Sequence, residues 1–515
     1  MAASIAETLK QLEQTRVTPS PPEASTPVMK ANLSALAESM SGQSAAPAYS
    51  PVVLAGLVRA VEFLIIIGTG MLVHSLYVVP LSGFRFEYYI AIAAIGAASI
   101  LVFQILDINH VAAFRTPLYQ AFRLAGGWAL VFLAALALVF FIRVEPAFSR
   151  IWLLSWFTVG LTVLLIERGF LSMFVRKMTR AGRLDRRTVI VGGGPAAESL
   201  LQAFSSQEDT DLRIYGVFDD RTDDRSPDVV AGYPKLGNVD DLVEFARHTR
   251  IDLVIFTLPI TAEGRMLQML RKLWVLPIDI RLAAHTNKLR FRPRSYSYIG
   301  NVPVLDVVDK PIADWDVVVK AAFDRIVGGL ALLILSPVFL LVALAVKLDS
   351  RGPVFFRQKR YGFNNELIEV FKFRSMYADK LDHTASKLVT KDDARVTRVG
   401  RFIRKTSLDE LPQLFNVAIF GNLSLVGPRP HAVHAKAADR QYDEVVDGYF
   451  ARHRVRPGIT GWAQINGWRG ETDTPEKIQR RVEHDLYYIE NWSILFDLYI
   501  LALTPLSLLR SENAY

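Results

Sequence analysis

The chain contains no cysteine in its 515 residues. Disulfide bonds within the chain, thiolate catalysis and cysteine-ligated iron–sulfur clusters are therefore excluded. The long apolar stretches also lack the runs of ionisable residues that line an ion or substrate path through a membrane. We therefore expect these stretches to hold the protein in a membrane rather than to transport a solute.

Apolar and basic residues are both abundant. Hydrophobic residues make up 51% of the chain, and the formal net charge is +8. A basic protein can bind nucleic acid, anionic lipid or phosphorylated substrates. Because the cations here lie beside apolar segments, we expect inner membrane lipids and phosphates as partners, and no nucleic acid.

The first part of the chain predicts a membrane anchor. Residues 1–50 are rich in Ala, Ser, Pro and Thr, and we expect a disordered cytoplasmic tail there. Within residues 51–170, four apolar stretches each approach the roughly 20 residues that cross a bilayer. These stretches cover 52–78, 87–106, 125–143 and 151–167. A strongly basic segment follows the fourth stretch and predicts a cytoplasmic exit, so a four-helix transmembrane bundle is expected.

A fifth apolar segment, residues 326–347, differs from the other four because Ser336 and Pro337 lie at its middle. Proline removes a backbone donor and kinks a helix. Basic residues flank both ends, and a straight crossing would place them on opposite sides of the membrane. The local sequence leaves two structures open: a kinked span, and a re-entrant helix hairpin that enters and leaves by one face.

Residues 185–310 change to short β-rich runs that alternate with helical ones, which predicts a parallel α/β sheet. The first strand is followed by Gly192-x-Gly194-x-x-Ala197, and Asp219 ends the second strand. This is the context of a Rossmann-like dinucleotide-binding fold. It indicates bound NAD only weakly, because no catalytic Tyr-x-x-x-Lys or cysteine follows it. We expect this domain to serve regulation or assembly.

Residues 404–430 carry the strongest chemical signal. They place the adjacent carboxylates Asp409 and Glu410 between basic residues and the rigid turn Gly427-Pro428-Arg429-Pro430. Paired acids beside cations suit metal-assisted chemistry on a phosphate, with one acid as nucleophile or metal ligand. A structural interpretation also stands: Ser407-x-x-Glu410 fits a helix capping box, and the two interpretations are compatible.

Several motifs together resemble one family. SLDELPQLFNV lies at 407–417, FFRQKRYG at 355–362, VFKFRSM at 370–376 and RHRVRPGITGWAQINGWRG at 452–470. They are similar to motifs of the bacterial sugar transferases that act on polyprenyl phosphate, the monotopic phosphoglycosyl transferases. The whole architecture more loosely resembles the long undecaprenyl-phosphate glucose or galactose phosphotransferases of exopolysaccharide synthesis.

The resemblance implies a mainly α catalytic domain over residues 318–515, in which 326–347 is a re-entrant membrane helix broken at Ser336 and Pro337. It implies transfer of a sugar 1-phosphate from a UDP-sugar to undecaprenyl phosphate, with release of UMP, and glucose 1-phosphate is the expected group. It also implies a covalent route: Asp409 attacks phosphorus, Glu410 acts as metal ligand or base, and Mg²⁺ bridges the carboxylates and the diphosphate. The catalytic domain would lie on the cytoplasmic face of the bacterial inner membrane.

Basic side chains in these motifs are candidates for binding the substrate phosphates. Guanidinium groups match phosphate geometry, so the first choices are Arg374, Arg404 and Arg429. The second choices, which could bind lipid headgroups instead, are Arg357, Arg360 and Lys372. A glycine-rich turn is predicted either to grip the nucleotide or to be purely structural; its polar and glycine positions are Arg456, Gly458, Thr460 and Gln464.

Two other functions remain open on the sequence. A membrane-tethered, NAD-dependent sugar-nucleotide oxidoreductase would use the middle domain, and nicotinamide bound to the purified protein would reveal it. An inactive scaffold for polysaccharide assembly would not need the intact Asp409, Glu410 and Arg429. The sequence does not define the oligomeric state, and a homo-oligomer is compatible with it.

Overall fold

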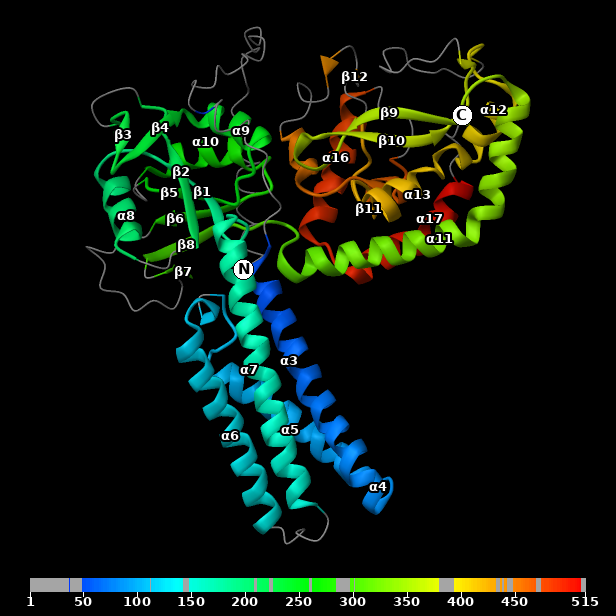
Figure 1. Cartoon of the computed structure of the whole chain (residues 1–515). Helices are drawn as coiled ribbons and strands as arrows, with labels where there is room; N and C mark the ends of the chain where they lie inside the picture. The colour runs from blue at the N-terminus through cyan, green and yellow to red at the C-terminus, as the bar shows by residue number, and fades with distance from the viewer. Residues whose placement is uncertain are drawn as a thin grey trace.

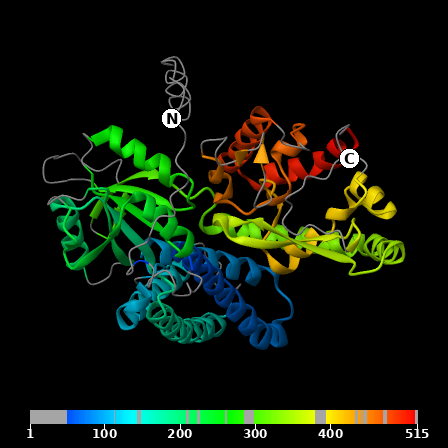
Figure 2. The ribbon, with the colours of Figure 1, turned by 90° about the horizontal axis from the view of Figure 1, so that it is seen from above.

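The computed structural model describes Ala37 and residues 49–111, 113–141, 148–207, 211–221, 226–258, 262–283, 297–300, 302–378, 393–431, 436–437, 440–441, 448–468 and 474–510. The tail expected over residues 1–50 lies almost entirely outside these ranges. Figure 1 shows a helical bundle with two further parts at one end of it, an α/β part and a part formed by the C-terminal region of the chain. Seen from above in Figure 2, these two parts lie side by side.

Four long apolar helices form the bundle. They are α3 (Pro51–Val73), α5 (Phe86–Ile105), α6 (Pro117–Phe141) and α7 (Arg150–Arg180). A π-helical turn, η1 (His74–Val78), and α4 (Val79–Ser82) extend α3, and the short η2 (Ala113–Arg115) precedes α6. Trp128, Trp152 and Trp156 are buried in the shared core, and Glu62 of α3 forms a buried ion pair with Arg168 of α7. The helices therefore hold one another through aromatic packing and one buried charge pair.

The middle part is an eight-stranded sheet with the order β3-β4-β2-β1-β5-β6-β8-β7. Its strands are β1 (Arg186–Val191), β2 (Leu212–Phe218), β3 (Val229–Val230), β4 (Tyr233–Gly237), β5 (Leu253–Phe256), β6 (Asp279–Ala283), β7 (Ser297–Ile299) and β8 (Val302–Val308). Successive side chains of a strand point to opposite faces. Val189 and Val191 therefore pack with α9 (Val239–His248) and α10 (Glu263–Leu273), whereas Ile190 packs with α8 (Pro195–Ser205).

The parallel sheet expected here forms only at the centre. β1 pairs in parallel with β2 and β5, and the neighbouring strands β4 and β6 continue that pattern. The edges are antiparallel: β3–β4 and β7–β8 are hairpins with short turns, and β8 also pairs antiparallel with β6. Ala231 and Gly232 have positive φ between β3 and β4, and Gly300 has positive φ between β7 and β8. Such left-handed positions are typical of tight hairpins.

The 36-residue helix α11 (Asp314–Asp349) opens the last part of the chain and contains Pro337 in its interior. Figure 1 shows α11 lying across the direction of the bundle helices and then bending away from the bundle. The bend is the expected effect of an interior proline, and Ser336 Oγ donates to the Leu333 carbonyl at 2.8 Å beside it. In the described part of the chain, α11 is the fifth helix that is long and apolar enough to cross a membrane.

Short elements pack on α11 and complete the fold. They are β9 (Phe355–Tyr361), η5 (Phe363–Asn365), β10 (Leu367–Phe373), α12 (Arg398–Lys405), η7 (Leu408–Glu410), α13 (Gln413–Phe415), η8 (Asn416–Phe420), β11 (Ser424–Val426), β12 (Lys436–Ala437), β13 (Arg440–Gln441), η9 (Tyr449–Arg454), β14 (Gly458–Thr460), α15 (Trp462–Ile465), α16 (Pro475–Glu490) and α17 (Ile494–Arg510). Phe339 of α11 is buried in one core with Phe373, Val417 and Tyr488. This core fixes the η7 turn between α11 and the β9–β10 hairpin.

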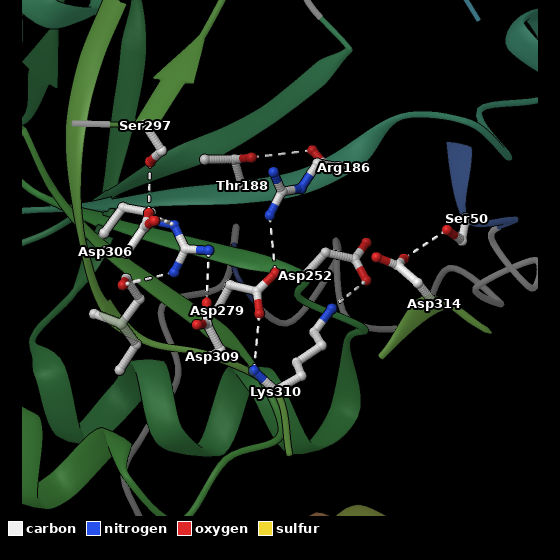
Figure 3. A network of polar contacts seen from close by, with 12 residues as sticks. Ser50, Arg186, Thr188, Asp252, Asp279, Ser297, Asp306, Asp309, Lys310 and Asp314 are labelled. Atoms are coloured by element: carbon white, nitrogen blue, oxygen red, sulfur yellow. Dashed lines mark hydrogen bonds and ion pairs between the residues drawn. The ribbon is translucent and has the colours of Figure 1, made fainter. Parts of the chain in front are cut away.

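Polar contacts join the three parts where α11 begins (Figure 3). Ser50, the N-cap of α3, donates to the Asp314 carboxylate at 2.6 Å. In the sheet, Arg186 Nη2 donates to Asp279 at 2.9 Å, and the backbone N–H of Lys310 donates to the other Asp279 oxygen at 3.0 Å. The first strand of the sheet and the segment that leads into α11 are thus held together beside the start of the bundle.

Candidate active site

Asp409 and Glu410 lie in a tight turn rather than in the first turn of a regular helix. α12 ends at Lys405, Ser407 has a positive φ of 59°, and the 3-10 turn η7 then carries both acids. The capping-box prediction is wrong, because Ser407 makes no capping hydrogen bond. The Glu410 side chain turns instead toward two cations from distant segments.

One oxygen of Glu410 accepts both of those cations. Lys372 Nζ of β10 lies 2.9 Å from Glu410 Oε1, and Arg429 Nη2 lies 2.6 Å from the same atom. Burial alone would raise the pKa of Glu410, but Arg429 and Lys372 outweigh burial and hold this pKa well below its usual range. Glu410 is therefore ionised at neutral pH, and it fixes the positions of Lys372 and Arg429.

Asp409 is the less stabilised of the two acids. Burial and the adjacent charge of Glu410 raise the pKa of Asp409 to about 6, against the attraction of Lys372, Arg404 and Arg429. Within the described part of the chain, its carboxylate accepts no hydrogen bond. An ionised carboxylate that is poorly solvated and unpaired is suited to attack an electrophile or to bind a cation.

A small, open pocket lies beside Glu410. Most of the residues that line it are polar. They come from β9, β10, η7, α13, β14 and residues 427–430, called the proline-rich turn below. The lining residues are Arg360, Val370, Lys372, Glu410, Gln413, Arg429, Pro430 and Gly458. The predicted residues Arg360, Lys372, Glu410 and Arg429 thus share one cavity. Gln413 also lines the pocket, although the sequence motifs did not indicate it as a site residue. It follows Glu410 by one helical turn, and that spacing could have indicated it.

Arg374 lies outside this group, which corrects its prediction as a first-choice phosphate ligand. Its side chain is buried, and its guanidinium donates to the carbonyl oxygens of Arg351 at 2.9 Å and Ser350 at 2.7 Å. A third bond, of 3.3 Å, goes to the Val346 carbonyl inside α11. A helix leaves its last carbonyls without partners. Arg374 satisfies these carbonyls and ends α11.

The other predicted arginines divide between the site and the surface. Arg404 is partly buried in α12, and its charge acts on Asp409. The Arg357 side chain is 64% exposed, lies over the Phe371 ring and is 3.5 Å from Glu369 across the β9–β10 hairpin. Arg357 therefore sits on the outer surface of the hairpin, in a position suited to lipid headgroups.

The glycine-rich turn near residue 456 contains a strand. Gly458 and Thr460 belong to β14, which pairs in parallel with β11, and Thr460 Oγ1 bonds to Thr504 Oγ1 at 2.9 Å. The backbones of Gly427 and Gly458 approach so closely that a Cβ on either residue would clash. These contacts favour the structural interpretation for Gly458 and Thr460. Arg456, before β14, and Gln464, in α15, are partly buried and form no side-chain hydrogen bond with another described residue, so both roles stay open for them.

Asp409 and Glu410 could together hold a divalent cation. The described residues contain no group of three or more His, Cys, Asp or Glu side chains able to do so. Mg²⁺, however, typically takes only one or two protein carboxylates and fills its other positions with water and substrate phosphates. The unpaired Asp409 carboxylate and the second oxygen of Glu410 fit such a shared site.

In the sheet, Asp219 and Arg221 bind the glycine loop after β1. Asp219 is buried, and it accepts from the Gly193 N–H and from Arg221 Nη2, each at 2.6 Å. Arg221 Nη2 also donates to the Gly193 carbonyl at 2.9 Å. In dinucleotide-binding sheets the acid at this position binds a ribose hydroxyl. Here that hydroxyl would have to displace Arg221, which argues against an NAD-dependent function.

Two family profiles match separate regions of the chain, and several known proteins match most of its length. The profile of the bacterial sugar transferase family matches residues 315–511, and that of a CoA-binding domain matches residues 104–284. An undecaprenyl-phosphate glucose phosphotransferase of Komagataeibacter xylinus is 41% identical over 70% of this chain and 66% of its own length. A UDP-glucose:undecaprenyl-phosphate glucose-1-phosphate transferase of Xanthomonas campestris pv. campestris is 33% identical over 89% of this chain and 94% of its own length. A protein of the same name from Escherichia coli (strain K12) is 36% identical over 85% and 92%.

Proposed function

We propose the function of this chain from the premise that it belongs to the bacterial sugar transferase family. The chain is a hexose-1-phosphate transferase that moves glucose 1-phosphate from UDP-glucose to undecaprenyl phosphate, the first membrane step of an exopolysaccharide. Two relatives that it matches over 94% and 92% of their length carry this reaction in their names. The family profile covers the part of the chain that contains Asp409 and Glu410.

Asp409 is the nucleophile of a two-step transfer. Its carboxylate oxygen forms a bond to the phosphorus next to glucose, and the phosphoanhydride bond breaks, so that UMP leaves with the electron pair. Undecaprenyl phosphate then attacks the same phosphorus, and Asp409 regains its carboxylate. The carrying observation is the contrast between the two acids: Glu410 is already neutralised by Lys372 and Arg429, whereas Asp409 is partly buried, has a raised pKa and accepts no hydrogen bond from the described residues.

The cations of the pocket bind and orient the diphosphate. Lys372 and Arg429 each donate one N–H to Glu410 and have further donors for phosphate oxygens. Arg360, from strand β9, lines the same pocket. Glu410 holds these donors in place before substrate arrives, which reduces the cost of organising them. Asp409 and Glu410 would hold Mg²⁺, which would supply neutralisation of the charge that develops on the departing phosphate.

The bent helix α11 is re-entrant and keeps the pocket on the cytoplasmic side. Leu333, Ile334 and Leu340, on both sides of Pro337, are 71%, 72% and 72% exposed, which suits contact with lipid tails. A helix that enters and leaves the inner membrane by its cytoplasmic face holds the pocket at the headgroups. There the phosphate of undecaprenyl phosphate and cytoplasmic UDP-glucose can both reach Asp409.

Membranes that contain the chain test this function. They are incubated with undecaprenyl phosphate and, separately, with UDP-glucose, UDP-galactose or UDP-N-acetylgalactosamine, and released UMP is measured. We expect release with UDP-glucose, its loss in EDTA and its recovery with Mg²⁺. Release with another sugar alone reassigns the substrate. Equal release from membranes with Asp409→Asn assigns the activity to a different enzyme, and no release with any sugar overturns the function.

A further inference from the structure

The turn that carries Arg429 is held by its carbonyl oxygens. Pro428 and Pro430 have no backbone N–H, so they cannot donate to a neighbouring strand. Instead, the Pro428 carbonyl accepts from the Gly458 N–H at 2.9 Å, and the Pro430 carbonyl accepts from Arg360 Nη1 at 3.3 Å. The carbonyl of Arg429 itself accepts from Arg452 Nη2 at 2.8 Å. Arg452 thus bonds directly to the peptide of the residue that reaches Glu410.

Arg452 is held in a single orientation. Its side chain is 0% exposed, and Nη2 donates a second bond to Asp485 Oδ2 of α16 at 2.6 Å. On its other side, Nη1 lies 2.6 Å from His431 Nδ1, and the guanidinium lies 5.4 Å from the centre of the Tyr449 ring. A buried arginine pays a large desolvation penalty unless such partners surround it. The fork of bonds therefore ties η9, α16 and the proline-rich turn into one unit.

We propose that Arg452, held by Asp485, is a positioning residue that fixes Arg429 for the transfer reaction. The inference rests on the proposed function. Arg452 does not line the pocket and acts through the peptide of Arg429, whose guanidinium then meets Glu410 and the substrate phosphates. Without this bond the Arg429 carbonyl loses its charged donor, and the guanidinium loses the alignment that the diphosphate requires. Small misplacements of such groups reduce rates strongly.

A double-mutant cycle separates positioning from general stabilisation. Arg452→Lys keeps the charge and can reach Asp485, but it loses the fork that bonds two acceptors at once. We expect UMP release to fall by about tenfold or more when Arg452→Lys is the only change, mainly in kcat. In an Arg429→Ala background the same change should cost less than about twofold, because the residue through which it acts is absent.

Arg454→Lys is the matched control. Arg454 lies in the same η9 turn, is buried, and donates to the Asp309 carbonyl at 3.1 Å rather than to the site. Its cost should be equal in the two backgrounds. An equal cost of Arg452→Lys in both backgrounds overturns the inference and leaves the proposed function standing, whereas wild-type protein that releases no UMP overturns the function. If Arg452→Lys does not fold, Asp485→Asn replaces it in the cycle, with the same two outcomes.

Discussion

Lys372 and Arg429 meet at one atom, because both donate to Oε1 of Glu410, at 2.9 and 2.6 Å. The two residues come from strand β10 and from the proline-rich turn, so the contact joins segments that are far apart in sequence. It also separates the roles of the two acids. Glu410 organises the cations, and Asp409 beside it keeps a carboxylate with no hydrogen bond in the described part of the chain.

Asp409→Asn should abolish transfer. The amide keeps the size of the side chain but cannot form the bond to phosphorus, so neither UMP release nor a phosphosugar adduct on the protein is expected. The adduct is sought by mass spectrometry after a brief incubation with UDP-glucose, with Arg357→Ala as an active control because Arg357 lies on the exposed surface of the hairpin. Retention of even a few per cent of the wild-type rate contradicts the assignment.

The same variant should change the pH dependence of stability in metal-free protein. The pKa of Asp409 is raised to about 6, so its ionisation opposes folding. Protonated Asp409 makes its full contribution to the free energy of unfolding below the pKa that this residue has in the unfolded chain. That contribution is lost as pH rises through about 6. Asp409→Asn should therefore raise the thermal midpoint most above pH 6, and the gain should shrink as pH falls toward 4. A gain that is constant with pH would show that Asp409 does not titrate in this way.

Arg374→Met should destabilise the protein rather than weaken substrate binding. The change leaves carbonyls at the end of α11 without donors, and we expect a loss of about 3 kcal/mol in the free energy of unfolding. Arg357→Met, at an exposed position, should change it by less than about 0.5 kcal/mol. Denaturant unfolding and the KM for UDP-glucose are measured together. Unchanged stability with a raised KM would restore Arg374 as a phosphate ligand.

Cysteine labelling tests the re-entrant helix, since the chain has no cysteine of its own. Arg85→Cys, in the loop between α4 and α5, should react with a membrane-impermeant maleimide added outside the cell, whereas Arg351→Cys, after α11, should react only from the cytoplasmic side. Adding Pro337→Ala removes the kink, and a straight segment of 22 residues at roughly 1.5 Å each reaches about 33 Å, enough to cross the core. A fraction of Arg351→Cys should then react outside. Outside labelling without Pro337→Ala rules out the hairpin.

Residues 312–515 alone should keep detectable transferase activity. None of the pocket residues comes from the sheet or the bundle. The cut exposes the Phe450 ring, on which Arg247 of α9 lies, and removes the Asp309 carbonyl from Arg454, so lower stability is expected. UMP release is measured in nanodiscs beside the full chain. A folded fragment without activity would show that the sheet contributes to the reaction.

Local signals in the sequence predicted the long apolar helices and the alternation of strands and helices over residues 185–310. Helices such as α8 (Pro195–Ser205), after the glycine motif, and α9 (Val239–His248) alternate with strands as expected, because hydrophobic period and glycine positions are local properties. The antiparallel edges were missed, since the β3–β4 turn uses Ala231 and Gly232 rather than a recognisable hairpin pair. The fourth apolar stretch was also placed too short, because α7 continues through the basic residues to Arg180.

For the site, the sequence shows which residues are neighbours along the chain, but it does not show which residues contact one another in the fold. Asp409 and Glu410 are neighbours in sequence, whereas the choice of Lys372 over Arg374 as a partner depends on how β10 packs. Lys372 lies in β10 and Arg374 directly follows this strand, but carbonyls at the end of α11 bind Arg374. Identical charge therefore produces a site residue at one position and a helix cap at the other.

The hydrogen bond from Ser50 to Asp314 links the first residues of α3 and α11, so we expect the position of α11 to depend on the tilt of the bundle. A bundle whose apolar length exceeds the local hydrocarbon layer tilts to hide the excess. Because α3 and α11 begin at the same point, a tilt of the bundle is passed to α11 and moves the pocket relative to the headgroups. Under the proposed function the lipid phosphate stays at the headgroup level, so we expect a thicker or thinner membrane to change how often it meets Asp409, with no change in the pocket itself.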